Sequence, residues 1–319
     1  MEIDFLAIGD TVTDAFIKLK DAKVHCNINN EDCTISMRWG DKIPYEDVVV
    51  VPGVGNPANA AVAASRLGLK TAFVTDIGTD RYGDEIMQHF EEENVAITWV
   101  RRHEHIKTNY HFVLSFGAER TILVKHEHYP YALPKDLTEP KAIYFSSLGE
   151  DSLAYHDEII NFAEAHPDML FVFQPNTFQI KLGVEPLKRI YKRANLVFAN
   201  KEEYQRILGL PETHDDVPDL MKRMHALGVT TPILTDGRAG AYALEHGEII
   251  HVPMFPDPAP PVERTGAGDA FSSTTAAFFS MGMPLKDAMI RGTVNSAYVV
   301  QKIGAQAGLL TKEELESKL

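Results

Sequence analysis

The sequence predicts an α/β fold in which helices sandwich a mainly parallel sheet and a small β-rich lid is attached. Apolar strand-like runs alternate with helical stretches over most of the chain, which is typical of a parallel sheet covered on both faces. Two segments, about 15–50 and 97–125, instead carry short alternating runs typical of antiparallel strands. With 319 residues, of which 45% are hydrophobic, the chain is long enough for one large core. We therefore interpret residues 1–319 as one domain, in which those two segments together form the lid.

The first strand is expected at 5–8 and ends at Gly9-Asp10. The lid strands follow as alternating runs at 15–19, 34–39, 48–51, 97–100, 110–115 and 121–125, the last two on either side of Gly117-Ala118. A helix begins next to Pro57, with Asn56 expected as its N-cap, and Gly68 ends it.

The strand–helix alternation then continues to the end of the chain. Further strands are expected at 71–75, 142–145, 169–173, 195–199 and 231–235. Helices are expected at about 83–93, 151–165, 184–192, 201–208, 217–227, 267–281 and 284–302. The runs 241–244 and 249–252 flank Glu245-His246-Gly247-Glu248, which predicts a hairpin at the edge of the sheet.

Composition excludes several classes of partner. The formal net charge of −14 argues against binding of nucleic acid or of a membrane surface, because both need a basic footprint. No apolar run approaches the roughly 20 residues that span a bilayer, and the opening MEIDFLAIGD is unlike a signal peptide. Cys26 and Cys33 are the only cysteines, so we expect no disulfide framework and a reducing, cytoplasmic location.

The segment Thr265-Gly266-Ala267-Gly268-Asp269 gives the strongest functional signal. Its two glycines allow close approach of a ligand, and the small residues that follow predict a helix whose free N–H groups face an anion. Asp269 is well sited there to accept a proton from a hydroxyl, while the neighbouring amides stabilise charge on a transferred phosphoryl group. The alternative is a glycine turn in which Asp269 only starts the helix.

A second glycine segment spans 53–59. It matches the relaxed dinucleotide pattern G-x-G-x-x-A, with Asp76 near the expected distance, and taken alone it favours an oxidoreductase. However, Pro57 removes one N–H from the helix start and the preceding strand looks antiparallel. Asn56 and Asn59 suit a polyol better, because amide side chains bind neighbouring hydroxyls. A capped helix start without a ligand is the simplest alternative.

Two shorter patterns follow buried strands. Asn200 and Glu203 lie on one face of a predicted first helical turn, where oxygen ligands can hold hydrated Mg²⁺. By itself this pattern is more often just an N-cap with an acidic first turn. The run from Thr235 to Gly240 ends another strand, where α/β sheets commonly bind nucleotides, or it is a plain turn into the hairpin.

Taken in order, these segments resemble the PfkB (ribokinase-like) carbohydrate kinase family over nearly the whole chain. The resemblance rests on 9–14, on 55–63 with its G-x-N start, on 76–84, on Asn200 with Glu203, on Thr235 with Gly237 and Gly240, and on Gly266-Ala267-Gly268-Asp269. No single string is decisive, but the combination in this order is highly specific.

The resemblance implies a ribokinase-like fold and an ATP- and Mg²⁺-dependent kinase acting on a hydroxyl of a sugar, with a hydroxymethyl group as the expected acceptor. It makes Asp269 the base and residues 266–268 the anion hole. Substrate contacts are implied for Asp14, Gly55, Asn56 and Asn59. Asn200 and Glu203 are implied to organise metal and phosphates, and Thr235, Gly237, Gly240 and Asn295 to lie near the nucleotide.

The chain departs from the family pattern at three positions. Glu263 and Arg264 stand where members usually carry Asp and a small Thr or Cys, which weakens the case for an activating monovalent cation beside the loop. Val54 replaces one glycine of the pair usual before the sugar-contacting Asn, so the identity of the substrate does not carry over.

Several alternatives stay open. A nucleoside kinase of the same fold is the nearest. A sugar-phosphate kinase becomes plausible if several of the basic residues 101, 102, 107, 120 and 125 point inward rather than form a solvated face. A non-catalytic sugar-binding relative and an NAD-dependent oxidoreductase are more distant. His103, His105, His126 and His128 have same-face strand spacing, for which exposed lid histidines are favoured over a metal site. The exposed edges of a β lid suggest pairing of two lids into a homodimer.

Overall fold

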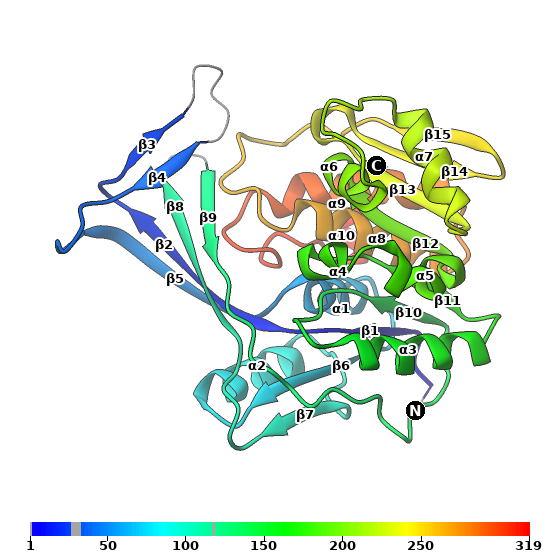
Figure 1. The fold of residues 1–319 in the computed structure, drawn as a ribbon, viewed down its shortest axis with the longest axis horizontal. Coiled ribbons are helices and arrows are strands. Elements are labelled where there is room, and N and C mark those ends of the chain that lie inside the picture. The colour runs from blue at the N-terminus through cyan, green and yellow to red at the C-terminus, as the bar shows by residue number, and fades with distance from the viewer. Residues whose placement is uncertain (1, 27–32, 117–118) are drawn as a thin grey trace.

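A nine-stranded sheet forms the centre of the molecule (Figure 1). The structure is a computed structural model and describes residues 2–26, 33–116 and 119–319. In the spatial order given below, each strand from β13 across to β7 is parallel to its neighbour, and the hairpin of β14 and β15 adds an antiparallel edge. The order across the sheet is β15 (Glu248–Val252), β14 (Ala241–Glu245), β13 (Thr231–Thr235), β12 (Leu196–Asn200), β11 (Leu170–Phe173), β10 (Ala142–Phe145), β1 (Phe5–Ile8), β6 (Thr71–Gly78) and β7 (Val100–His103).

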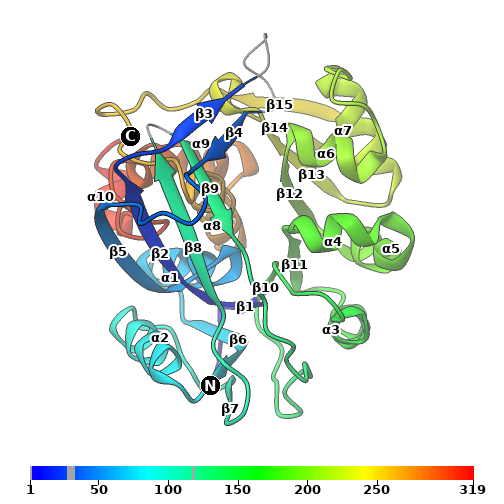
Figure 2. The ribbon, with the colours of Figure 1, turned by 60° about the vertical axis from the view of Figure 1, so that its left-hand side comes forward.

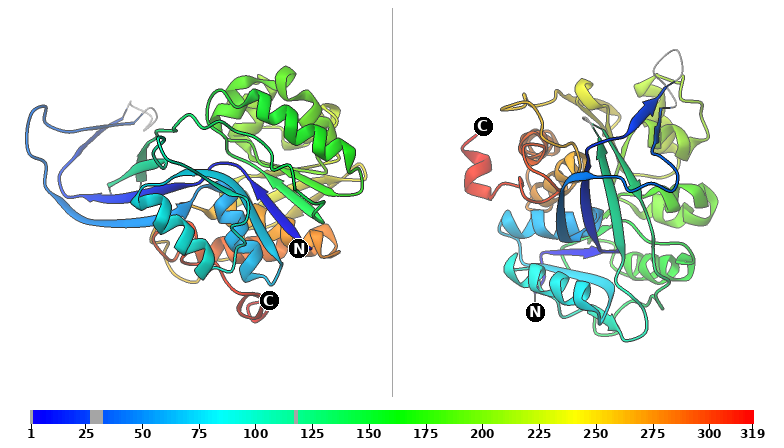
Figure 3. Two further views of the ribbon diagram at one scale, coloured as in Figure 1. Left: turned by 90° about the horizontal axis from the view of Figure 1, so that it is seen from below. Right: turned by 90° about the vertical axis from the view of Figure 1, so that its left-hand side faces the viewer.

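Helices cover both faces of this sheet, as the view from below makes plain (Figure 3). One layer contains α3 (Leu153–Ala165), α4 (Thr177–Leu182), α5 (Val184–Arg193), α6 (Lys201–Leu208) and α7 (Val217–Ala226). The other contains α1 (Asn56–Arg66), α2 (Arg81–Glu92), α8 (Ala267–Ser280), α9 (Leu285–Val299) and α10 (Lys312–Glu316). The predicted fold class is confirmed.

Burial on both faces of the sheet explains why the sequences of these strands are apolar throughout. In β1, Leu6 and Ile8 pack in the core beneath the α3 layer, whereas Phe5 and Ala7 pack on the α1 and α8 side. A strand buried on both faces has no solvated side to mark with polar residues. Short α4 and α10, which the apolar pattern did not predict, begin at capping boxes on Asn176 and Thr311.

A four-stranded lid projects from one end of the large sheet (Figure 2). Its strand order is β5 (Tyr45–Val54), β2 (Val12–Leu19), β8 (Tyr110–Phe116) and β9 (Glu119–Leu123). Strand β2 pairs antiparallel with β5 and parallel with β8, so segments about one hundred residues apart share one sheet. The prediction that separated parts of the chain build the lid therefore holds for these strands.

Two boundaries of the predicted lid are wrong. The run 97–100 does not supply a lid strand: β7 lies at the edge of the large sheet, parallel to β6, where Asp76 contacts Arg101 and His103. Strand β4 (Thr34–Ser36) pairs with β3 (Lys23–His25) in a separate two-stranded ribbon rather than in the lid sheet. The predicted turn at Gly117-Ala118 lies outside the described residues.

The cysteines also differ from expectation. Antiparallel pairing of β3 with β4 brings Cys26 and Cys33 together, and they form a disulfide with Sγ atoms 2.04 Å apart. The expectation that no disulfide supports the fold was therefore wrong for the β3–β4 ribbon, while the cytoplasmic location stays a prediction. Within the described ranges, no helix has the length and apolar character needed to cross a bilayer.

Candidate active site

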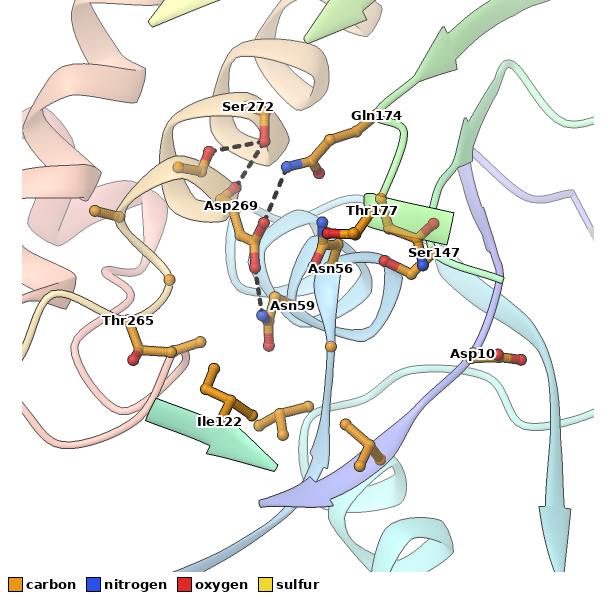
Figure 4. Close-up of a pocket in the computed structure, with 18 of the residues that line it drawn as sticks. Asp10, Asn56, Asn59, Ile122, Ser147, Gln174, Thr177, Thr265, Asp269 and Ser272 are labelled. Atoms are coloured by element: carbon orange, nitrogen blue, oxygen red, sulfur yellow. Dashed lines mark hydrogen bonds between the residues drawn. The ribbon is translucent and has the colours of Figure 1, made fainter. Parts of the chain in front are cut away.

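A cavity of about 640 Å³ lies between the lid and the carboxyl ends of the parallel strands. This edge of an open α/β sheet is the usual place for a ligand. The structure brings most of the residues singled out in the sequence to this cavity, which is lined by Asp14, Gly55, Asn56, Asn59, Asn200, Glu203, Thr235, Gly266, Ala267, Gly268 and Asp269. Figure 4 labels Asn56, Asn59 and Asp269 among them.

Asp269 lies in the first turn of α8 with an amide side chain on each oxygen. Asn59 Nδ2 donates to its Oδ2 at 2.7 Å, and Gln174 Nε2 donates to its Oδ1 at 3.0 Å (Figure 4). Burial raises the pKa of the Asp269 carboxyl, while these two hydrogen bonds act in the opposite direction by stabilising the charged form. The carboxylate is thus held in one orientation at the cavity wall.

The N-terminus of α8 presents free backbone donors beside this carboxylate. Gly266 caps the helix at φ 81°, and the first helical hydrogen bond joins Ala270 N–H to Gly266 O. The N–H groups of Ala267, Gly268 and Asp269 precede that bond and have no helical acceptor. Gly266 is needed for a second reason, because a Cβ there would lie 2.5 Å from Ala305 Cα. These free donors are what an anion hole needs, and that role of residues 266–268 stays a prediction.

Helix α1 supplies the amides opposite α8. Its N-cap is Gly55, with φ 106°, and not Asn56 as expected. Because no side chain caps this helix, the Asn56 amide is left to line the cavity. Asn59 is buried and its amide is already bonded on both sides, to Asp269 and to Gln306.

Asn200 and Glu203 form a capping box at the start of α6. Asn200 Oδ1 accepts from Glu203 N at 2.8 Å, and Glu203 Oε2 accepts from Asn200 N at 2.9 Å. Asn200 and Glu203 therefore do cap the helix, as the alternative without a ligand predicted, although both residues also line the cavity. Burial raises the pKa of the Glu203 carboxyl. Its Oε1 takes no part in the capping box, so one carboxylate oxygen remains for a hydrated Mg²⁺, which needs only one or two carboxylates beside phosphates.

The lid closes the other side of the cavity with groups that the sequence only partly indicated. Asp14, from β2, lies 3.5 Å from His111 Nδ1, and its Oδ1 is buried without a hydrogen-bond partner. Asp10, which was not singled out, accepts from His126 Nδ1 at 3.0 Å and from Tyr131 at 2.9 Å. His126 is therefore a half-buried residue of the cavity wall and not an exposed lid histidine.

Two further residues could have been found from their position alone. Gln174 directly follows β11 and Ser147 follows β10, at the same edge of the sheet as Asn200. Neither Gln nor Ser is distinctive by itself, so only their position just after a parallel strand could have indicated that they line the cavity.

The basic residues of 101–125 mostly turn away from the cavity. Arg101 pairs with Asp76, Arg102 with Asp84 and Lys125 with Glu127, whereas Arg120 lines the cavity and lies 3.4 Å from Glu263 Oε1. Asp76 is thereby committed to structure, which removes the acidic group on which the dinucleotide interpretation depended. In the described part of the chain, no cluster of three or more His, Cys, Asp or Glu side chains forms a metal site.

A smaller recess of about 230 Å³ adjoins the main cavity across the N-terminus of α8. Gly237 and Gly240 line it, and Thr235 lines both spaces. Asn295 does not reach either one. It is fully buried, donating to Thr274 Oγ1 and accepting from Leu310 N, so a direct contact has no support here and its place near the nucleotide stays a prediction. Its neighbours on α9, Thr293, Ser296 and Ala297, line the recess instead.

Comparison with known proteins agrees with this geometry. The sequence profile of the pfkB family carbohydrate kinases matches residues 25–312. An ATP-dependent 6-phosphofructokinase of Thermoanaerobacterium thermosaccharolyticum is 25% identical over 294 residues, covering 89% of each chain. A ribokinase of Staphylococcus aureus is 24% identical over 86% of this chain and 91% of its own. A fructokinase of Klebsiella pneumoniae is 28% identical over 84% and 92%.

Solved structures share the fold. A nucleoside kinase of Methanocaldococcus jannaschii superposes with a TM-score of 0.80 at 18% identity, covering 100% of this chain and 98% of its own. The ribokinase of Arabidopsis thaliana complexed with ribose and ATP gives 0.81 at 18% identity, covering 99% and 98%. Because the family profile spans most of the sequence, the chain belongs to the pfkB family of carbohydrate kinases, which are phosphotransferases with an alcohol group as acceptor.

Proposed function

We propose that this protein transfers the γ-phosphoryl group of ATP to a hydroxyl, most simply a hydroxymethyl group, of a sugar. The observation that carries the proposal is the place of Asp269. It lies at the cavity wall, in the first turn of α8, between the side chains of Asn59 and Gln174. A base and a set of free N–H donors at one point are what phosphoryl transfer to an alcohol requires.

In this reaction Asp269 takes the proton of the acceptor hydroxyl as its oxygen bonds to the γ-phosphorus. The bond between that phosphorus and the bridging oxygen breaks, and ADP leaves. The N–H groups of Ala267 and Gly268 stabilise charge on the transferred group, since they have no acceptor within the helix. Thr235, Gly237 and Gly240 bind the rest of the nucleotide from the adjoining recess.

Mg²⁺ supplies neutralisation of phosphate charge when it is bound. The donor set that fits it is Asn200 with Glu203, whose second carboxylate oxygen is outside the capping box. These residues would act through water, because Mg²⁺ dehydrates reluctantly and usually keeps several waters beside the phosphates that it binds.

The acceptor lies between the lid and α1. Asp14 Oδ1 is a buried acceptor without a partner, which suits a sugar hydroxyl. Gly55, Asn56 and Asn59 face it from the start of α1. A monovalent cation beside the anion hole has support from one oxygen only: Glu263 Oε1 is used by Thr265 N at 2.8 Å and by Arg120, whereas its buried Oε2 has no hydrogen-bond partner.

The test is ATP consumption with Mg²⁺ over pentoses, hexoses, sugar phosphates and nucleosides. We expect turnover with at least one free sugar. No turnover with any acceptor would contradict the kinase function, and an acceptor outside the sugars would contradict the substrate class.

Nucleosides are the second candidate because part of the cavity is apolar. Phe178, Ile122 and Val124 line it, and the Phe178 ring packs edge-on against His126 with 5.2 Å between centroids. A nucleobase would fit against such a surface. Sugar phosphates are favoured by a different pair, Arg120 and Lys181, which also line the cavity. The acceptor panel separates the three classes.

We also propose that two copies pair through the outer face of the lid. Strand register places Val50, Phe112 and Leu123 in one row across the lid, and these side chains are 45%, 43% and 52% exposed. The opposite row contains buried Phe16 and Val113 together with Ile122, which lines the cavity. An apolar row on the face away from the cavity is expected when a second lid covers it.

A further inference from the structure

Gln306 is buried in the segment that follows α9 and does not line the cavity. Its Nε2 donates to Gly53 O at 2.8 Å and to Asn59 Oδ1 at 2.9 Å. Asn59 in turn donates to Asp269. Gln306 therefore stands one residue behind the group that holds the carboxylate, and no part of the phosphoryl-transfer mechanism above uses it.

The donor and acceptor of each hydrogen bond from Gly53 through Gln306 and Asn59 to Asp269 follow from one backbone carbonyl. Gly53 O can only accept, so the Gln306 atom beside it must be the NH₂ group. The same NH₂ group faces Asn59, so the Asn59 atom there is the oxygen. The remaining Asn59 atom is then its NH₂ group, which faces Asp269 Oδ2 at 2.7 Å. Gln306 thus prevents the Asn59 amide from turning its oxygen toward the carboxylate.

The segment that carries Gln306 is itself held rigidly. Arg66 Nη1 donates to Gln306 O at 2.7 Å and to Leu309 O at 2.9 Å, and its guanidinium also pairs with Glu93. On the other side, His89 Nε2 lies 2.7 Å from Gln306 Oε1. Because the Gln306 oxygen can only accept, His89 carries its proton on Nε2 in this arrangement.

From this geometry we propose that Gln306 is a positioning residue for the base, fixing the Asn59 amide so that it donates to Asp269. The proposal depends on the proposed function, in which Asp269 accepts the hydroxyl proton. A carboxylate that is free to rotate loses its alignment with that proton, and misplacement of a reacting group by about 1 Å costs on the order of a hundredfold in rate.

The variant Gln306→Met keeps the side-chain length and removes both hydrogen-bonding groups. We expect kcat to fall about tenfold to a hundredfold while the KM for ATP changes little, because the nucleotide residues are untouched. Gln301→Met is the matched control: Gln301 opens the same segment and donates to Ala259 O and Ala297 O, away from Asp269. It should keep the kcat of the original enzyme.

A double-mutant cycle separates positioning from a general loss of structure. If Gln306 acts through Asn59, Gln306→Met should lower kcat strongly in the original chain. Added to the variant Asn59→Ala, it should lower kcat hardly at all. Equal losses in both backgrounds, or an unchanged kcat in Gln306→Met, would overturn the proposal.

A measurement that does not require kinase activity separates the test of Gln306 from the test of the proposed function. The ¹³C carboxyl signal of Asp269, assigned by its absence in Asp269→Asn, reports the pKa directly. Loss of the Asn59 donor should move the Asp269 pKa upward in Gln306→Met, and Gln301→Met should leave it in place. If the original chain shows no kinase activity but this shift occurs, the proposed function fails while the positioning contact stands. No shift would overturn the contact itself.

Discussion

Asn59 and Asp269 are 210 residues apart in the chain and are joined by a hydrogen bond of 2.7 Å. One amide on α1 thereby ties the helix that faces the acceptor to the helix that carries the base. This bond links the substrate side of the cavity to its catalytic side, and the first three predictions below concern the Asp269 carboxyl that it holds.

Replacing the base should remove catalysis and spare binding. Asp269→Asn keeps the shape of the side chain but cannot take up the hydroxyl proton, so we expect kcat to fall about a hundredfold to ten thousandfold. Nucleotide affinity, measured by calorimetry, should change little because Thr235 and the recess are untouched. Asp136→Asn, at an exposed position, controls for the loss of one charge. A variant Asp269→Asn that kept most of its activity would refute the assignment.

The rate should depend on pH through Asp269. Burial raises the pKa of this carboxyl above its ordinary value, and only the deprotonated form can accept a proton. The value of kcat/KM should therefore fall on the acid side at a higher pH than an ordinary aspartate would give. A profile of kcat/KM against pH measures this limb. A profile whose acid limb lies at the ordinary aspartate value would contradict it.

The same substitution should stabilise the fold at neutral pH. Because the pKa of Asp269 is higher in the folded than in the unfolded chain, its ionisation costs stability as the pH rises from the unfolded pKa, and the cost is fully present above the folded pKa. Asn carries no such charge. The Tm of Asp269→Asn should exceed that of the original chain at neutral pH, and the difference should shrink as the pH falls toward the unfolded pKa. Calorimetry at several pH values tests the trend, and a lower Tm at neutral pH would oppose it.

Gly266 and Gly268 should differ sharply when each is changed to Ala. Gly266 has φ 81° and its Cβ would lie 2.5 Å from Ala305 Cα, so Gly266→Ala should lower the free energy of unfolding by about 1–2 kcal/mol or more. A Cβ at Gly268 meets nothing within 4 Å. Gly268→Ala should therefore leave the free energy of unfolding unchanged or slightly raised. Urea denaturation compares the two, and equal losses would contradict this explanation.

The lid pairing predicts a concentration-dependent dimer. Light scattering at micromolar concentration should give twice the mass of one chain, and Val50→Lys, which puts a charge into the exposed row, should give a single chain. Lys18→Ala, on an adjacent lid strand, is a control because its ion pair with Glu46 is exposed. A single chain at all concentrations would exclude the pairing.

Short, local patterns were readable from the sequence. The glycines around Asp269 and the polar ends of buried strands depend on neighbours within a few residues, and the structure brings these positions to one cavity. The hairpin β14–β15 is another such case: His246 and Gly247 have φ values of 51° and 83°, as a tight turn between these strands requires.

Contacts between distant segments were not readable. Nothing near Gln174 or Gln306 distinguishes these amides from others, since their partners lie 95 and 247 residues away. Strand β7 was assigned to the lid because its edge position and its ion pairs with Asp76 depend on β6. The burial of Asn295 was not readable for the same reason, because its partners Thr274 and Leu310 belong to other parts of the chain.

The hydrogen bonds that the side-chain amides of Asn59, Gln174 and Gln306 make around Asp269 also have a consequence for folding kinetics. Its hydrogen bonds close separations of 95, 210 and 247 residues, and contacts of such range form slowly because each must overcome a large loop-closure entropy. Secondary structure and the local cores can assemble before the base is aligned. The return of enzymatic activity during refolding should therefore lag behind the return of helical circular dichroism, and so report the completion of the whole fold.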